Sequence, residues 1–120
     1  MTPCDGCLLV HMDGQADPYS IKQMLADIAG SVQKNDLKAI LLEDCLTEHL
    51  SLIDLYYTAS RLDTTGLGRE TRIGLWCPDV TAAEDLRFAA TVARNFGYDA
   101  LYSADRTEIE KWLAGVPVIE

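Results

Sequence analysis

Acidic side chains close the first two apolar runs of the chain and could hold a metal ion. Asp13 follows the run Cys7–Met12, and Glu43 and Asp44 end the run Lys38–Asp44. We expect both runs to be parallel strands, and ligands of open parallel sheets bind beyond the carboxyl ends of the strands. Mg²⁺ takes a few carboxylate oxygens and completes its octahedron with water. One hypothesis is therefore a metal-dependent enzyme with Asp13, Glu43 and Asp44 as ligands.

Most other acidic residues singled out in the chain have a structural explanation. Many of them fall in the first turns of predicted helices, where the helix dipole favours negative charge; these are Asp17, Asp54, Glu84, Asp105 and Glu108. This explanation covers more of the acidic residues than metal binding does. We therefore predict no cofactor.

Large apolar side chains gather near one end of the predicted sheet and suggest a second kind of site. A pocket lined mainly by such side chains is typical of small-molecule sites. The sequence thus offers a binder of a small apolar ligand or lipid as a further hypothesis, with a lining of Leu46, Leu50, Ile53, Tyr57 and Trp76.

Nucleophilic chemistry finds little support in the sequence. His49 could act as a general base, but no Ser or Cys nucleophile stands in a recognisable elbow or triad context. His11 has apolar neighbours, which favours a half-buried, hydrogen-bonded histidine over a metal ligand. Cys4 and Cys7 have the spacing of a redox or zinc pair, but they precede a strand, so we expect free thiols. We predict no catalytic residues.

Strands and helices alternate along the chain. The apolar runs 7–12, 39–43, 72–77 and 98–102 are typical of strands, and residues 44–50 read as a loop. Each strand is followed by a helix, for which Asp17, Ser51, Thr81 and Asp105 are the expected N-caps. In the second helix Leu52, Leu55, Tyr56, Ala59 and Leu62 form the expected buried face, with Ile53 and Tyr57 on the other side. The pattern predicts parallel β-α-β units in an α/β fold.

Charge and length restrict the function classes. The 120 residues fit a single domain, 1–120, and the net charge of -9 disfavours nucleic acid and anionic membrane partners. The sequence has neither a secretion signal nor an apolar run of the roughly 20 residues that span a bilayer, so we expect a cytoplasmic protein without membrane insertion.

The C-terminal part of the chain resembles a known family. Four segments carry the likeness, namely Arg72–Cys77, Ala93–Tyr98, Leu101–Asp105 and Glu108–Leu113. They resemble SpoIIAA-like domains, which are allied to STAS domains and to the CRAL-TRIO fold. The resemblance implies a four-turn β-α superhelix with a mainly parallel four-stranded sheet, and a non-enzymatic, regulatory module that works through protein-protein interaction.

Ser51 is the candidate modification site that this resemblance implies. In anti-sigma-factor antagonists a serine at the start of the second helix is phosphorylated, within an Asp-Ser-Ser-Gly-like motif. Ser51 has the comparable place, although its neighbours Leu50 and Leu52 differ from that motif. A phosphosite and a plain helix cap both remain open.

Surplus apolar residues predict a homodimer. If the four strands lie in sequential order, right-handed crossovers place the helices on one face, and the other face needs cover. The chain's tail could supply part of this cover. Ile53, Tyr57, Trp76 and Val118 would then be material for an interface with a second copy.

Overall fold

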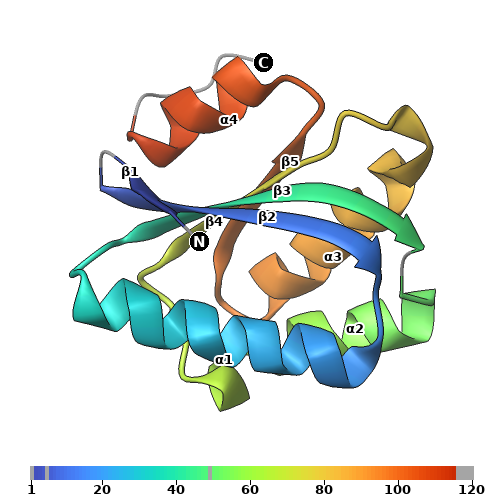
Figure 1. Ribbon diagram of the computed structural model, residues 1–120, viewed down its shortest axis with the longest axis horizontal. Helices are drawn as coiled ribbons and strands as arrows, with labels where there is room; N and C mark the ends of the chain where they lie inside the picture. Colours follow the sequence, from blue (N-terminus) through green and yellow to red (C-terminus); the bar gives the residue numbers. More distant parts are fainter. Residues whose placement is uncertain (1, 5, 49, 116–120) are drawn as a thin grey trace.

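A five-stranded sheet runs through the protein in the order β1-β2-β3-β4-β5 (Figure 1). The computed structural model describes residues 2–4, 6–48 and 50–115. Strands β2 (Cys7–Gln15), β3 (Ala39–Glu48), β4 (Arg72–Trp76) and β5 (Asp99–Ser103) are parallel, and the short β1 (Thr2–Cys4) pairs with β2 in the antiparallel direction. The predicted α/β class with four parallel strands is confirmed, and β1 is an addition to it.

Three helices cover one face of the sheet and one covers the other (Figure 1). The elements are α1 (Pro18–Lys34), α2 (Leu52–Ser60), α3 (Ala83–Asn95), α4 (Arg106–Leu113) and the 3₁₀ turns η1 (Leu62–Thr65) and η2 (Val80–Ala82). Helices α1 to α3 connect consecutive parallel strands, which keeps them together on one face of the sheet, here called the helix-layer face. No strand follows α4 in the described chain, so no crossover fixes its side. The expectation that all helices share one face is wrong for α4.

The helix-layer face carries the larger core. Alternate residues of each strand point to this face and pack against α1, α2 and α3. They include Leu8, Val10, Met12, Ile40, Leu42, Ile73, Leu75, Ala100 and Tyr102. The core therefore forms between the sheet and the three crossover helices.

A glycine lets α4 approach the opposite face, here called the α4 face. A Cβ atom at Gly74 would lie 2.7 Å from Ile109 Cγ2 and 3.1 Å from Leu113 Cδ1. Ile109, a residue of α4, is fully buried between this helix and the sheet. The small residue in β4 thus sets how closely this helix packs.

Two strands extend past their predicted ends. β2 continues to Gln15 and β3 to Glu48, so the predicted loop over 44–50 is wrong for most of its length. The register pairs Asp13 with Cys45 and Gly14 with Leu46 before an irregularity at Gly14/Gln15. Backbone hydrogen bonds of the parallel ladder hold these residues in the strands. Such bonds form between main-chain groups, so polar side chains do not prevent them.

Side-chain caps begin three of the four helices as predicted. Asp17, Ser51 and Asp105 each accept a hydrogen bond from a first-turn backbone N–H, at 2.9, 3.2 and 2.9 Å. The prediction for Thr81 is wrong, because this residue lies inside η2 and its hydroxyl donates to Asp79 Oδ1 at 2.8 Å. Within residues 2–4, 6–48 and 50–115, no helix combines the length and apolar character needed to cross a bilayer.

Candidate functional site

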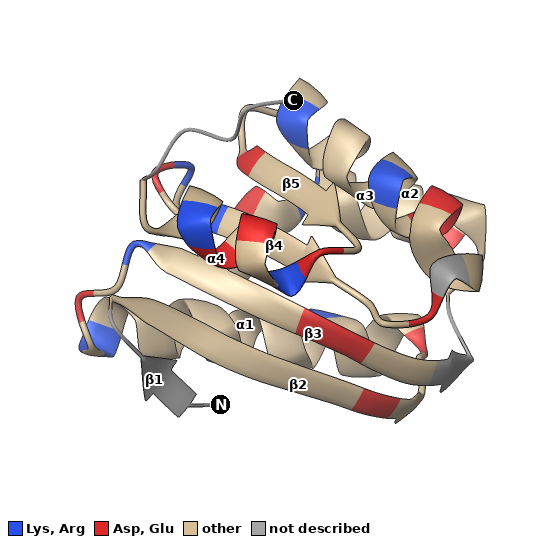
Figure 2. Cartoon of the chain, turned by 90° about the horizontal axis from the view of Figure 1, so that it is seen from above, with Lys and Arg blue, Asp and Glu red and all other residues tan. Residues whose placement is uncertain are grey.

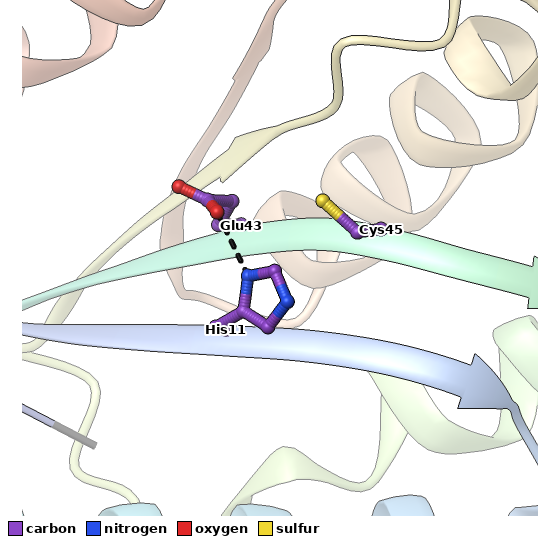
Figure 3. Close-up of side chains that lie close together, drawn as sticks. All are labelled: His11, Glu43 and Cys45. Carbon is purple, nitrogen blue, oxygen red and sulfur yellow. Dashed lines mark hydrogen bonds and ion pairs between the residues drawn. The ribbon is translucent and has the colours of Figure 1, made fainter.

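A polar cluster occupies the α4 face around the middle of β2 and β3 (Figure 3). His11 and Glu43 are register partners on the two strands, and His11 Nδ1 lies 2.8 Å from Glu43 Oε1. Cys45 follows Glu43 by two residues, so the period of the strand returns it to the same face. Potential ligand atoms of these three residues all lie within 4.8 Å of one another.

Charged neighbours hold the outer edges of this cluster. Asp13 Oδ2 lies 3.4 Å from His11 Nε2. Arg106, the first residue of α4, lies 2.6 Å from Glu43 Oε2 through Nη1, and its Nε donates to Glu110 at 3.0 Å. Glu43 therefore joins a residue of β2 to the N-terminal end of α4.

The Cys45 thiol keeps its proton more strongly than an ordinary cysteine. Burial and the negative charges of Glu43, Asp44 and Asp13 raise the pKa of this thiol. Since the thiolate is the reactive form, Cys45 is a poor nucleophile in this setting. A metal ion at this cluster would have to displace the thiol proton, since the thiolate is also the form that binds metals.

Asp44 does not belong to this cluster, although it adjoins Glu43 in sequence. Adjacent strand residues point to opposite faces. Asp44 is only 2% exposed on the helix-layer face, where its Oδ1 accepts a hydrogen bond from Leu46 N at 3.0 Å. The structure thus brings Asp13 and Glu43 to one side of the sheet and places Asp44 on the other. The acidic residues toward the arrowheads of β2 and β3 are visible in Figure 2.

An apolar cavity of about 110 Å³ lies between the sheet and the three crossover helices. Its lining includes Leu46 and Leu50, both predicted as pocket residues, together with Asp44 and Asp85 near the carboxyl edge. Of the other predicted lining residues, Ile53 and Tyr57 are exposed on α2. Trp76 donates through Nε1 to Ala104 O at 3.0 Å and lies beside Arg106. The five residues therefore do not form one pocket.

Large apolar side chains stand exposed along one side of α2. Four of them, here called the α2 surface, are Leu52, Ile53, Tyr56 and Tyr57, with exposed fractions between 44% and 68%. Tyr56 also makes an edge-on contact with Phe96, at 6.4 Å between ring centres. The expectation that Leu52 and Tyr56 lie on the buried face of the helix is wrong. Leu55 and Ala59 face the cavity instead.

Four predicted residues need separate mention. Ser51 is exposed at the N-terminus of α2, next to the α2 surface. His49 and Val118 lie outside the described residues. Cys7 is half-buried at the start of β2.

Comparison of the chain with protein-family models, curated proteins and solved structures finds no significant match. The arrangement of side chains is therefore the basis for a functional proposal.

Proposed function

We propose that this protein is a non-enzymatic interaction domain, regulatory in the manner that the STAS-like resemblance implies, and that it forms a homodimer through the α2 surface. The observation that supports the proposal is the exposure of four adjacent large apolar side chains on α2. Contiguous apolar surface of this kind marks interaction sites in soluble domains. Aromatic residues, which are enriched in interface cores, supply two of the four.

The charges at the two ends of α2 favour a second copy as the partner. Asp54 lies in the first turn and Arg61 is the C-cap, seven residues later and on the same side of the helix. The separation along the axis is about 10 Å. In an antiparallel pair of α2 helices, Asp54 of each copy faces Arg61 of the other, as two-fold symmetry requires. The Arg61 guanidinium already lies 4.8 Å from the centre of the Tyr57 ring.

Apolar contact must overcome the repulsion between two chains that each carry a charge of -9. Salt screens this long-range repulsion and leaves apolar burial intact. Dimerisation should therefore strengthen as ionic strength rises, and analytical ultracentrifugation at two salt concentrations measures this.

A charge exchange tests the antiparallel arrangement. Asp54→Arg places Arg opposite Arg, and Arg61→Asp places Asp opposite Asp, so each variant alone should dimerise about tenfold more weakly. A mixture of the two variants restores both opposite-charge pairs and should form a heterodimer close to the wild-type affinity. Weakening in the mixture as well would contradict the antiparallel pair.

Substitution of exposed tyrosines tests the surface itself. Tyr57→Ser should raise the dimer dissociation constant at least tenfold, because an aromatic side chain leaves the interface. Tyr19→Ser is the matched control, since Tyr19 is exposed on α1 and lies outside the α2 surface. A wild-type chain that stays monomeric at high micromolar concentration in both salts would refute the homodimer.

Ser51 would give this interface a means of regulation. A phosphate adds about 1.5 to 2 negative charges, directly before Leu52 and Ile53. Ser51→Glu should weaken the dimer, whereas Ser51→Ala should leave its affinity unchanged and lower only stability, by about 0.5–2 kcal/mol. Equal dimer affinities for Ser51→Glu and wild type would reduce Ser51 to a helix cap.

The cavity on the helix-layer face favours a second candidate function, the binding of a small apolar molecule. Its volume of about 110 Å³ is below the roughly 150 Å³ that holds benzene and far below the 300 Å³ or more of drug-sized sites. A ligand must therefore be no larger than a few heavy atoms, and a lipid would require the helices to separate. Xenon titration followed by NMR tests this, with shifts expected at Leu46 and Leu50.

A further inference from the structure

The cluster on the α4 face combines three different metal-ligand chemistries. His11 offers an imidazole nitrogen, Glu43 a carboxylate oxygen and Cys45 a sulfur, all within 4.8 Å of one another. Two neighbouring parallel strands supply these residues, and His11 pairs with Glu43 in the register. The donors therefore stand on rigid backbone, which suits a preformed site.

This donor set selects the type of metal. Bond lengths near 2.0–2.1 Å to nitrogen or oxygen and 2.3 Å to sulfur place the donors of a tetrahedral zinc site about 3.3–3.8 Å apart. The distance of 2.8 Å from His11 Nδ1 to Glu43 Oε1 needs only a small opening to reach this range. Thiolate and imidazole ligands favour Zn²⁺ over Mg²⁺ and Ca²⁺, which take oxygen ligands.

The surroundings already supply the partners that orient metal ligands. Metal-bound histidines usually donate their other ring N–H to a carboxylate, and ligating carboxylates are themselves hydrogen-bonded. Asp13 Oδ2 lies 3.4 Å from His11 Nε2, and Arg106 Nη1 lies 2.6 Å from Glu43 Oε2. Both contacts use the outer atoms, His11 Nε2 and Glu43 Oε2, and leave His11 Nδ1 and Glu43 Oε1 next to each other inside the cluster.

We propose that His11, Glu43 and Cys45 bind one Zn²⁺ ion, with water as the fourth ligand. His11 is half exposed, so the ion can enter from solvent. Three protein ligands and one open position are the arrangement of zinc sites that exchange a ligand. This proposal is independent of the homodimer, because the α2 surface lies on helix α2 and the cluster lies on the opposite face of the sheet.

Zinc titration of the full chain tests the proposal. After removal of bound metal with a chelator, isothermal titration calorimetry should give one Zn²⁺ per chain, and Mg²⁺ should give no competing heat. His11→Ala and Cys45→Ser should each weaken Zn²⁺ binding at least 100-fold. Arg106→Ala should weaken it about 10- to 100-fold through the orientation of Glu43.

Cobalt substitution identifies the sulfur ligand. Co²⁺ bound to wild-type protein should show thiolate charge-transfer absorption, and Cys45→Ser should abolish it. Cys7→Ser is the matched control, since Cys7 is a half-buried thiol on β2 outside the cluster; it should keep both the absorption and the zinc affinity. Circular dichroism confirms that each variant is folded.

Substoichiometric zinc binding by the folded wild-type chain would overturn the proposal. So would zinc affinity that survives Cys45→Ser, or a loss of affinity that is as large in Cys7→Ser as in Cys45→Ser.

Discussion

The two faces of the sheet carry different kinds of side chains, although the same strands supply both. Along β3, Leu42 and Asp44 point to the helix-layer face, while Glu43 and Cys45 point to the α4 face. Three helices cover the first face and enclose an apolar cavity. A single helix of eight residues, α4, packs mainly on β3, β4 and β5 on the other. Among the described residues α4 packs little on β2, and this strand contributes His11 to the polar cluster.

The two faces also contribute differently to stability and to binding. Burial of apolar side chains supplies most of the folding free energy, and the helix-layer face holds most of those side chains. Ion pairs with solvent-exposed partners, such as those of the partly buried Glu43 with His11 and Arg106, contribute little. Substitutions on the helix-layer face should therefore lower stability strongly, whereas substitutions in the polar cluster should lower it little and should affect binding instead.

Truncation on the helix-layer face should have the largest effect on stability. Ile40 is fully buried in the core, and Ile40→Ala should lower the free energy of unfolding by about 2–5 kcal/mol. Glu43→Gln, on the other face, should cost about 1 kcal/mol or less. Chemical denaturation measures both, and equal losses would contradict the division between the faces.

Enlargement of Gly74 tests how closely α4 packs. The added methyl group of Gly74→Ala would clash with Ile109 Cγ2 at 2.7 Å, and overpacking of this kind costs about 1–3 kcal/mol. In an Ile109→Ala background the same change should cost much less. A double-mutant cycle by thermal denaturation gives the coupling, and the absence of coupling would mean that another contact holds α4 in place.

The sequence predicted the repeating elements because their signals are local. Continuous apolar runs marked β2 to β5, and Asp17, Ser51 and Asp105 marked helix starts through caps within their own first turn. The predicted ends of β2 and β3 were wrong because pairing between the two strands continues past their apolar residues. The side of the sheet on which α4 packs was not predictable, since no later strand among the described residues constrains it.

The candidate sites depended on register, which a single sequence does not provide. The metal hypothesis pairs Glu43 with Asp44 as acidic neighbours, although the period of a strand places their side chains on opposite faces. The pattern His11-x-Asp13 beside Glu43-x-Cys45 was a usable signal. It becomes a cluster only when His11 is aligned with Glu43.

Filling the cavity should raise the free energy of unfolding, by less than the truncation of Ile40 lowers it. Ala90 is buried in the lining, and Ala90→Val adds two carbon atoms that are worth about 0.8 kcal/mol each when buried. A lower helix propensity removes part of this gain, which leaves a net increase of about 1 kcal/mol. Thermal denaturation measures it, and a lower melting temperature would show that the space next to Ala90 is already filled.

The smallest expected effect concerns a polar atom on the helix-layer face. The Tyr102 hydroxyl is buried and has no hydrogen-bond partner among the described residues. Burial of the ring raises the pKa of this phenol, so the group stays neutral and its O–H remains to be satisfied. An unpaired buried hydroxyl costs free energy that Tyr102→Phe would recover. We expect the free energy of unfolding to rise by up to about 1 kcal/mol.

Tyr98 is the matched control for this change. Its hydroxyl is also buried but donates to Leu67 O at 2.7 Å. Tyr98→Phe should therefore lower the free energy of unfolding by about 0.5–1.5 kcal/mol, in the opposite direction to Tyr102→Phe. Urea denaturation of both variants gives the two signs. A loss at Tyr102 as large as that at Tyr98 would mean that water or a bound molecule reaches the Tyr102 hydroxyl, and the helix-layer face would then be less dry than its lining indicates.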